Sequence, residues 1–113
     1  MASYGIKMAE FIQVITSVDS AEKAVEIAQR LLKQRLAACV QVLGPVRSRY
    51  WWQGEFEEAE EWLCLIKARA TDYAQIESAI QEVHPYTVPE ILALPITAGN
   101  PDYLDWLRKE TAR

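Results

Sequence analysis

Five residues in this chain have side chains that could bind a metal or a small ligand. They are Cys39, Cys64, Lys67, His84 and Glu90. Thiolate and imidazole ligands suit copper or zinc better than magnesium. One chain offers only two cysteines and one histidine, so a closed four-ligand zinc site within one subunit is not expected. We therefore expect any bound metal to be copper, at a site that combines residues from two subunits.

The same residues also have plain structural interpretations. Cysteines in strands are commonly small buried hydrophobes, which applies to Cys39 and more strongly to Cys64, between two leucines. His84 could instead bind the last carbonyls of a helix. Lys67 could extend its ammonium group to water, or pair with a carboxylate such as Glu90 or with an anionic ligand.

Motifs that support catalysis do not occur in the sequence. There is no Cys-x-x-Cys, no His-Glu-x-x-His, no EF-hand loop, no glycine-rich phosphate loop and no nucleophile elbow. A nucleophilic role for Cys39 would need a base, and no spacing assigns one. The sequence therefore favours a binding protein over an enzyme.

The charge distribution and the hydropathy exclude two classes of partner. Twelve basic and sixteen acidic residues give a net charge of 12 − 16 = −4, and the acidic residues crowd between 55 and 61, so nucleic acid is not an expected partner. The longest apolar runs, such as 62–66, are far shorter than the roughly 20 residues that cross a bilayer. Residues 1–10 contain no apolar block of signal-peptide length, which predicts a cytoplasmic protein with reduced cysteines.

Hydrophobic periodicity predicts the elements that must position these side chains. Asp19, with Glu22 three residues later, forms an expected capping box before a helix, and the pair Gly44-Pro45 is expected to end a strand because proline cannot donate to a sheet. Gly54 suits a hairpin turn. The expected elements are strands at 10–17, 38–43, 62–69 and 90–96, an extended segment at 46–52, and helices at 20–35, 72–83 and 101–109.

This order, β-α-β-β-α-β plus a terminal helix, predicts an α+β, ferredoxin-like sandwich with a long hairpin between its second and third strands. Tyr50, Trp51 and Trp52 are consecutive in that hairpin, so their rings point to both of its faces. Exposed together, they exceed the apolar patch of roughly 400 Å² that a soluble monomer tolerates. The hairpin must therefore fold back on its own core or, as we favour, pack against a second copy of the chain.

Six short segments occur in order along the chain. They are Arg35-Leu-Ala-Ala-Cys-Val40, Ser48-Arg-Tyr-Trp-Trp-Gln-Gly54, Leu65-Ile-Lys67, His84-Pro-Tyr86, Val88-Pro-Glu90 and Gly99-Asn-Pro-Asp-Tyr-Leu-Asp-Trp106. Taken together, these segments resemble the CutA divalent-cation tolerance protein family. The resemblance spans about residues 11–107, with 1–9 as a loose extension, and indicates one CutA-like domain over 1–113.

The resemblance implies a ferredoxin-like subunit in a homotrimer similar to PII-type signalling proteins. It also implies a cytoplasmic location, copper binding in some members, a role in tolerance to divalent metal ions and no assigned reaction. By matching position, the expected metal ligands are Cys39, His84 and Glu90, the expected cleft residues are Lys67 and Tyr86, and the expected oligomer contacts are Tyr50, Trp51, Trp52 and Gly54.

Two departures from the family pattern bear on the expected site. Gln41 stands where an asparagine is common, and Thr87 stands where a glutamate is common, so ion affinity or selectivity would differ from other members. The alternative hypothesis is a PII-like signalling scaffold that holds an anionic metabolite against Lys67, with metal binding incidental.

Overall fold

The computed structural model describes residues 9–113, in which four strands form one antiparallel sheet. The expectation of a loose extension at residues 1–9 falls almost wholly outside the described residues. The elements are β1 (Phe11–Val18), α1 (Ala21–Lys33), β2 (Cys39–Trp52), β3 (Glu55–Arg69), a short 3₁₀ helix (Ala70–Asp72), α2 (Tyr73–Val83), β4 (Ile91–Ile96) and α3 (Pro101–Glu110).

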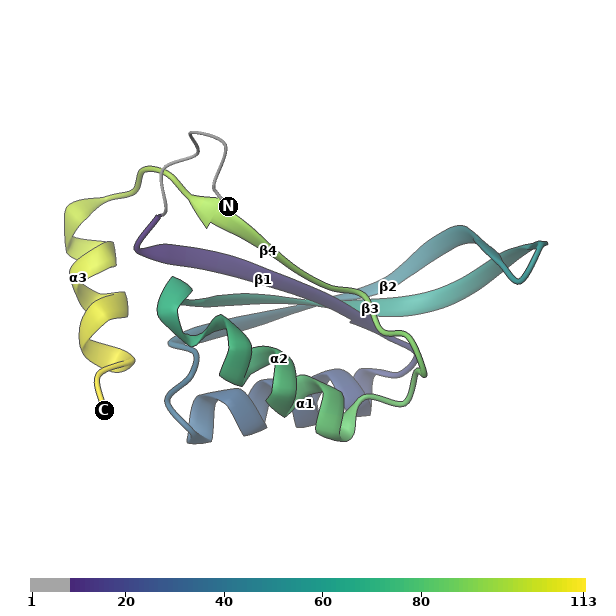
Figure 1. Ribbon diagram of the computed structural model, residues 1–113, viewed down its shortest axis with the longest axis horizontal. Helices are drawn as coiled ribbons and strands as arrows, with labels where there is room; N and C mark the ends of the chain where they lie inside the picture. Colours follow the sequence, from purple (N-terminus) through teal and green to yellow (C-terminus); the bar gives the residue numbers. More distant parts are fainter. Residues whose placement is uncertain (1–8) are drawn as a thin grey trace.

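The strand order is β2-β3-β1-β4, with α1 and α2 on one face of the sheet and α3 at its end (Figure 1). This arrangement confirms the ferredoxin-like α+β fold that the element order predicts. The core lies between the sheet and the two long helices, and is formed by side chains such as Val14, Ile66, Ile27 and Ile80. None of the helices described over residues 9–113 has the length and apolar character to cross a membrane.

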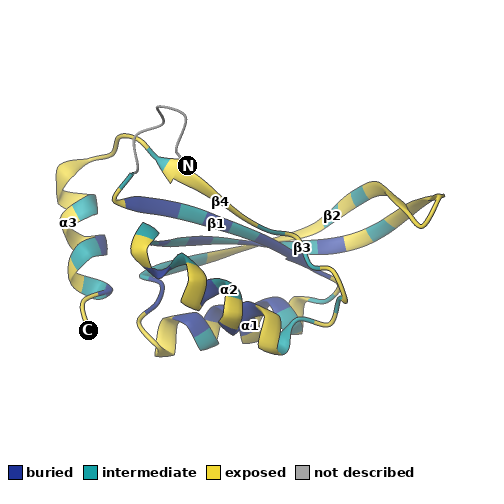
Figure 2. Cartoon of the chain, viewed as in Figure 1, coloured by how far each residue is buried: buried dark blue, intermediate teal, exposed yellow. Residues whose placement is uncertain are grey.

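The opposite face of the sheet carries exposed apolar side chains and is not covered by α1 or α2. Val14 is buried on the helix side and pairs with Ala93, so the flanking Leu92 and Leu94 point the other way. They are 56% and 46% exposed. Figure 2 shows β4 largely exposed while β1 beside it is buried. Exposed apolar side chains of this kind are typical of a surface that contacts another protein.

The N-cap of α1 differs from the expected one. Ser20, and not Asp19, precedes the helix in extended conformation, and its side chain accepts the Lys23 N–H at 3.1 Å. A cap needs its side-chain oxygen within reach of the third helical amide, and Ser20 satisfies this because the helix begins at Ala21.

β2 also differs, because it continues through the Gly44-Pro45 pair instead of ending there. The register with β3 shifts between Leu43 and Val46, so neither residue of the pair takes part in the ladder. β2 is an edge strand, where a proline without an N–H costs little. The expectation of a strand confined to 38–43 was wrong for this reason.

The acidic stretch belongs to β3, which begins at Glu55 and not at residue 62. Beyond the body of the sheet β2 and β3 form a two-stranded ribbon (Figure 1). Its carboxylates at 55, 57, 58 and 60 are exposed to water and are therefore tolerated there, whereas Glu61 is buried. Glu58 accepts from Arg49 at 3.1 Å and lies 3.5 Å from Arg47 across the ribbon.

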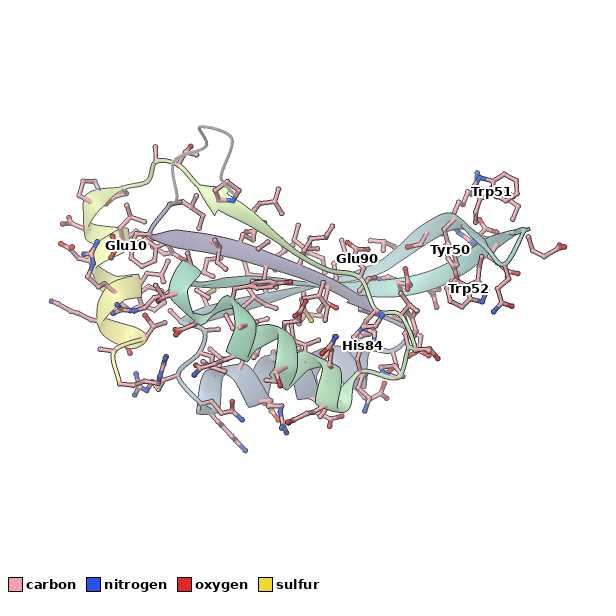
Figure 3. All side chains as sticks on the ribbon, in the orientation of Figure 1. Glu10, Tyr50, Trp51, Trp52, His84 and Glu90 are labelled. Carbon is pink, nitrogen blue, oxygen red and sulfur yellow. The ribbon has the colours of Figure 1, made fainter. Side chains whose placement is uncertain are left out.

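The ribbon extends away from the core, so the alternative in which it folds back on its own core is wrong. Trp51 remains 74% exposed and Phe56 63% exposed, with ring centroids 5.3 Å apart. Figure 3 shows Trp51 and Trp52 on opposite sides of the ribbon, far from Glu10 at the other end of the molecule.

Candidate functional site

Cys39 lies at the end of the sheet next to α3. It pairs in register with Lys67 and is half-buried. The ammonium group of Lys67 donates to Gln41 Oε1 at 2.6 Å, so the expected alternative pairing of Lys67 with Glu90 was wrong. Burial, together with the neighbouring Cys39, raises the pKa of Tyr103 on α3. The Cys39 thiol therefore lies near the Tyr103 phenol and near Lys67, whose ammonium group is hydrogen-bonded to the Gln41 side chain.

Cys64 belongs to the core, as its structural interpretation predicted. It is fully buried, and its thiol lies 3.6 Å from the carbonyl oxygen of Ala24. Burial raises the pKa of the Cys64 thiol to about 11. A thiol that stays protonated at neutral pH is a poor metal ligand.

Both ring nitrogens of His84 already have partners. Its Nδ1 accepts the Tyr86 N–H at 3.1 Å, and its Nε2 lies 2.9 Å from the carbonyl oxygen of Ser17. A carbonyl only accepts, so Nε2 carries the hydrogen and the ring is the neutral Nε2–H tautomer. The ring binds a strand carbonyl, so the side chain does not provide the expected cap of α2. His84 is nevertheless the C-cap residue of α2, because its backbone N–H donates to the Ile80 carbonyl at 2.9 Å. To bind a metal, His84 would have to lose one of the two ring hydrogen bonds.

Protonation of His84 is expected to make stability depend on pH. Burial lowers its pKa below the unfolded value, although the Ser17 carbonyl acts in the opposite direction. Below the ordinary value of about 6.5 the unfolded chain binds a proton that the folded chain does not, so stability falls as the pH decreases through the folded pKa. His84→Gln removes this dependence.

The measurement is urea unfolding of wild type and His84→Gln, with a chelator present, from about pH 7.5 to about pH 5. Wild type should be the more stable at the upper end, and the difference should shrink as the pH falls. A difference that stays constant or grows would contradict the assigned tautomer and burial.

A pocket of about 650 Å³ lies where the ribbon leaves the sheet, against the loop between α2 and β4. Figure 3 places His84 and Glu90 at this base of the ribbon. The wall on the ribbon side carries Tyr50, Trp52 and Glu61, and the loop side carries Tyr86 and Glu90.

A buried carboxylate and a phenol form the polar centre of this pocket. The Tyr86 hydroxyl donates to Glu61 Oε2 at 2.5 Å, and Glu61 is only 6% exposed. Burial, followed by the Glu61 carboxylate, raises the pKa of Tyr86, so the phenol remains a donor at neutral pH. Glu90 Oε1 accepts from Ser17 Oγ at 3.4 Å.

Sequence reasoning missed Glu61 and Ser17. It treated Glu61 only as part of the acidic cluster at 55–61, although Glu61 alternates with Leu63 and Leu65 in β3 and so shares a face with apolar side chains. That alternation was the available signal. No such signal was present for Ser17, because its carbonyl and its hydroxyl meet His84 and Glu90 only after folding.

One chain does not bring the three expected metal ligands together. Cys39 pairs with Lys67, and Lys67 pairs with Gln13 on β1. Ser17, which contacts His84 and Glu90, is four positions after Gln13 on the same strand. At about 3.3 Å per residue, Cys39 therefore lies about 13 Å along the sheet from the position of Ser17. Over residues 9–113 no three His, Cys, Asp or Glu side chains gather closely enough to hold a metal ion. The residues of a single described chain therefore do not fit a metal ion.

Known proteins with a similar sequence have consistent names. Residues 12–110 match the family model of the CutA1 divalent ion tolerance protein. The divalent-cation tolerance protein CutA of Thermus thermophilus is 47% identical over 98 residues, which cover 87% of this chain and 95% of that protein.

Solved structures of divalent cation tolerance proteins have the same fold as this chain. The Thermus thermophilus divalent cation tolerance protein has a TM-score of 0.87 at 45% identity, covering 90% of this chain and 99% of that one. A structure described as the periplasmic divalent cation tolerance protein CutA of Archaeoglobus fulgidus has a TM-score of 0.88 at 35% identity, covering 90% and 99%.

Proposed function

The chain belongs to the CutA1 divalent ion tolerance protein family, and from this premise we propose that it contributes to tolerance of divalent metal ions by binding copper or another divalent cation as a cytoplasmic homotrimer. The observation that carries the metal role is the family match over nearly the whole chain. The names of the relatives describe tolerance and no reaction, so we propose a binding role without catalysis. They also do not favour the PII-like signalling scaffold.

Two apolar surfaces support the proposed assembly. The open sheet face exposes Leu92 and Leu94, and the ribbon exposes Trp51 and Phe56. In a closed ring of three copies, each ribbon would pack against the sheet of a neighbour, so both surfaces would be removed from water. Both cysteines are free thiols, which supports a reducing compartment.

The separation of the expected ligands supports a metal site shared between subunits. Cys39 supplies a half-buried thiol, the soft ligand that copper prefers. A carboxylate or imidazole would then come from a neighbouring copy, since His84 and Glu90 of the same chain lie too far along the sheet.

Copper titration followed by calorimetry tests the role of Cys39. Cys39→Ser is expected to weaken copper binding at least about tenfold, because a hydroxyl is a much poorer ligand for a soft metal. Cys64→Ser is the matched control, because it removes the other thiol from a buried position that a metal cannot reach. Equal affinity of wild type and Cys39→Ser would remove Cys39 from the site.

A further inference from the structure

We propose that the pocket at the base of the ribbon binds a small organic cation, a primary ammonium group on an apolar or aromatic body. Its volume of about 650 Å³ is within the range of small-molecule sites, roughly 300–1,000 Å³. This proposal goes beyond metal tolerance and does not depend on a bound metal.

The buried Glu61 carboxylate is the first observation that indicates a cation. Tyr86 donates to Oε2, whereas Oε1 accepts no hydrogen bond from residues 9–113 and is accessible to solvent. A mostly buried carboxylate is less well solvated than an exposed one, so it attracts a cation more strongly. A ligand ammonium group would supply the missing donor and neutralise the charge.

The second observation is the charge of the pocket. In the described part of the chain no lysine or arginine forms an ion pair with Glu61 or Glu90. Arg49 also lines the pocket, but its guanidinium is paired with Glu58. The pocket therefore keeps two carboxylates without a cation, and the acidic strand around it adds to the negative potential.

The third observation is the aromatic wall. Tyr50 and Trp52 are two positions apart on β2, so both rings project from the same side of the ribbon. They line the pocket on the side of Glu61. Aromatic faces attract ammonium groups, and their area accommodates an apolar body.

The test is calorimetric titration with benzylammonium, and with benzyl alcohol as the neutral probe of similar shape, in a buffer that contains a chelator. Wild type should bind benzylammonium at least about tenfold more tightly than benzyl alcohol. Glu61→Gln, which can still accept from Tyr86, should lower benzylammonium affinity at least about tenfold. The matched control is Glu60→Gln, which removes one charge from the adjacent residue on the other side of the ribbon and should leave the affinity unchanged.

A second pair of variants tests the aromatic wall independently of the carboxylate. Trp52→Leu should weaken benzylammonium binding, whereas Trp51→Leu, on the opposite side of the ribbon, should not. Equal binding of the two probes, or equal loss with Glu61→Gln and Glu60→Gln, overturns the proposal. It is also overturned if benzylammonium does not bind while Glu61→Gln dissociates the oligomer, because the pocket would then hold a basic side chain of a second copy. Loss of copper binding has no bearing on either result.

Discussion

Gly44→Ala is expected to destabilise the fold by about 3 kcal/mol, at the upper end of the cost of overpacking a filled site. A Cβ atom at Gly44 would lie 2.1 Å from Cδ1 and 2.5 Å from Cγ of Trp62. These are ring atoms close to the backbone, so they cannot move aside as the end of a flexible chain can. The whole indole must turn, or the strand must separate from β3.

Urea unfolding measures this effect, with Gly99→Ala as the matched control. A Cβ at Gly99 meets the Leu104 side chain at 3.1 Å, a contact that a small rotation relieves. The control should therefore cost much less. In a double-mutant cycle, Trp62→Leu should remove most of the penalty of Gly44→Ala. If Gly44→Ala unfolds at the same urea concentration as wild type, the indole does not lie against Gly44.

Leu94→Glu is expected to convert the proposed trimer into monomers at micromolar concentration. Leu94 lies on the open face of the sheet, and symmetry would place the new carboxylate in every equivalent interface. Burying an unpaired charge costs several kcal/mol, so three copies should weaken assembly by orders of magnitude. The monomer fold should survive, because in one chain the side chain faces water.

Light scattering measures the oligomeric state of wild type first and of the variants second. Val25→Glu is the matched control, since Val25 on α1 has the same 46% exposure as Leu94 but lies on the helix side of the sheet. It should leave the trimer intact. A wild-type monomer, or a Leu94→Glu variant that remains trimeric, would show that the open face is not the interface.

The sequence predicted the order of the elements because hydrophobic spacing is a local property. The helical period of α1, the apolar residues on both faces of β1 and the Asn100-Pro101 start of α3 were all readable, and the structure confirms these elements. Errors occurred where the outcome depends on neighbours in the sheet. Pro45 should end a strand by local rules, but an edge strand with a shifted register tolerates it.

The candidate site was less predictable than the fold. His84, Tyr86 and Glu90 were selected from their motifs. In the structure Tyr86 and Glu90 line one pocket, and His84 lies beside it, accepting the Tyr86 N–H. The partners that give them their chemistry come from β1 and β3. Ser17 provides the carbonyl for His84, and Glu61 provides the carboxylate for Tyr86. These pairs are 67 and 25 residues apart in the sequence, and helix or strand periodicity cannot predict contacts over such distances.

The amino-acid sequence by itself determined the elements, their order, the membership in a family and the aromatic surplus of the hairpin. Only the tertiary structure decided that Cys39 lies apart from His84, that both nitrogens of the imidazole are used within the chain, and that Glu61 is buried beside a phenol. The physical reason is that helix and strand periodicity act between near neighbours, whereas hydrogen bonding and desolvation depend on groups that only the folded sheet brings together.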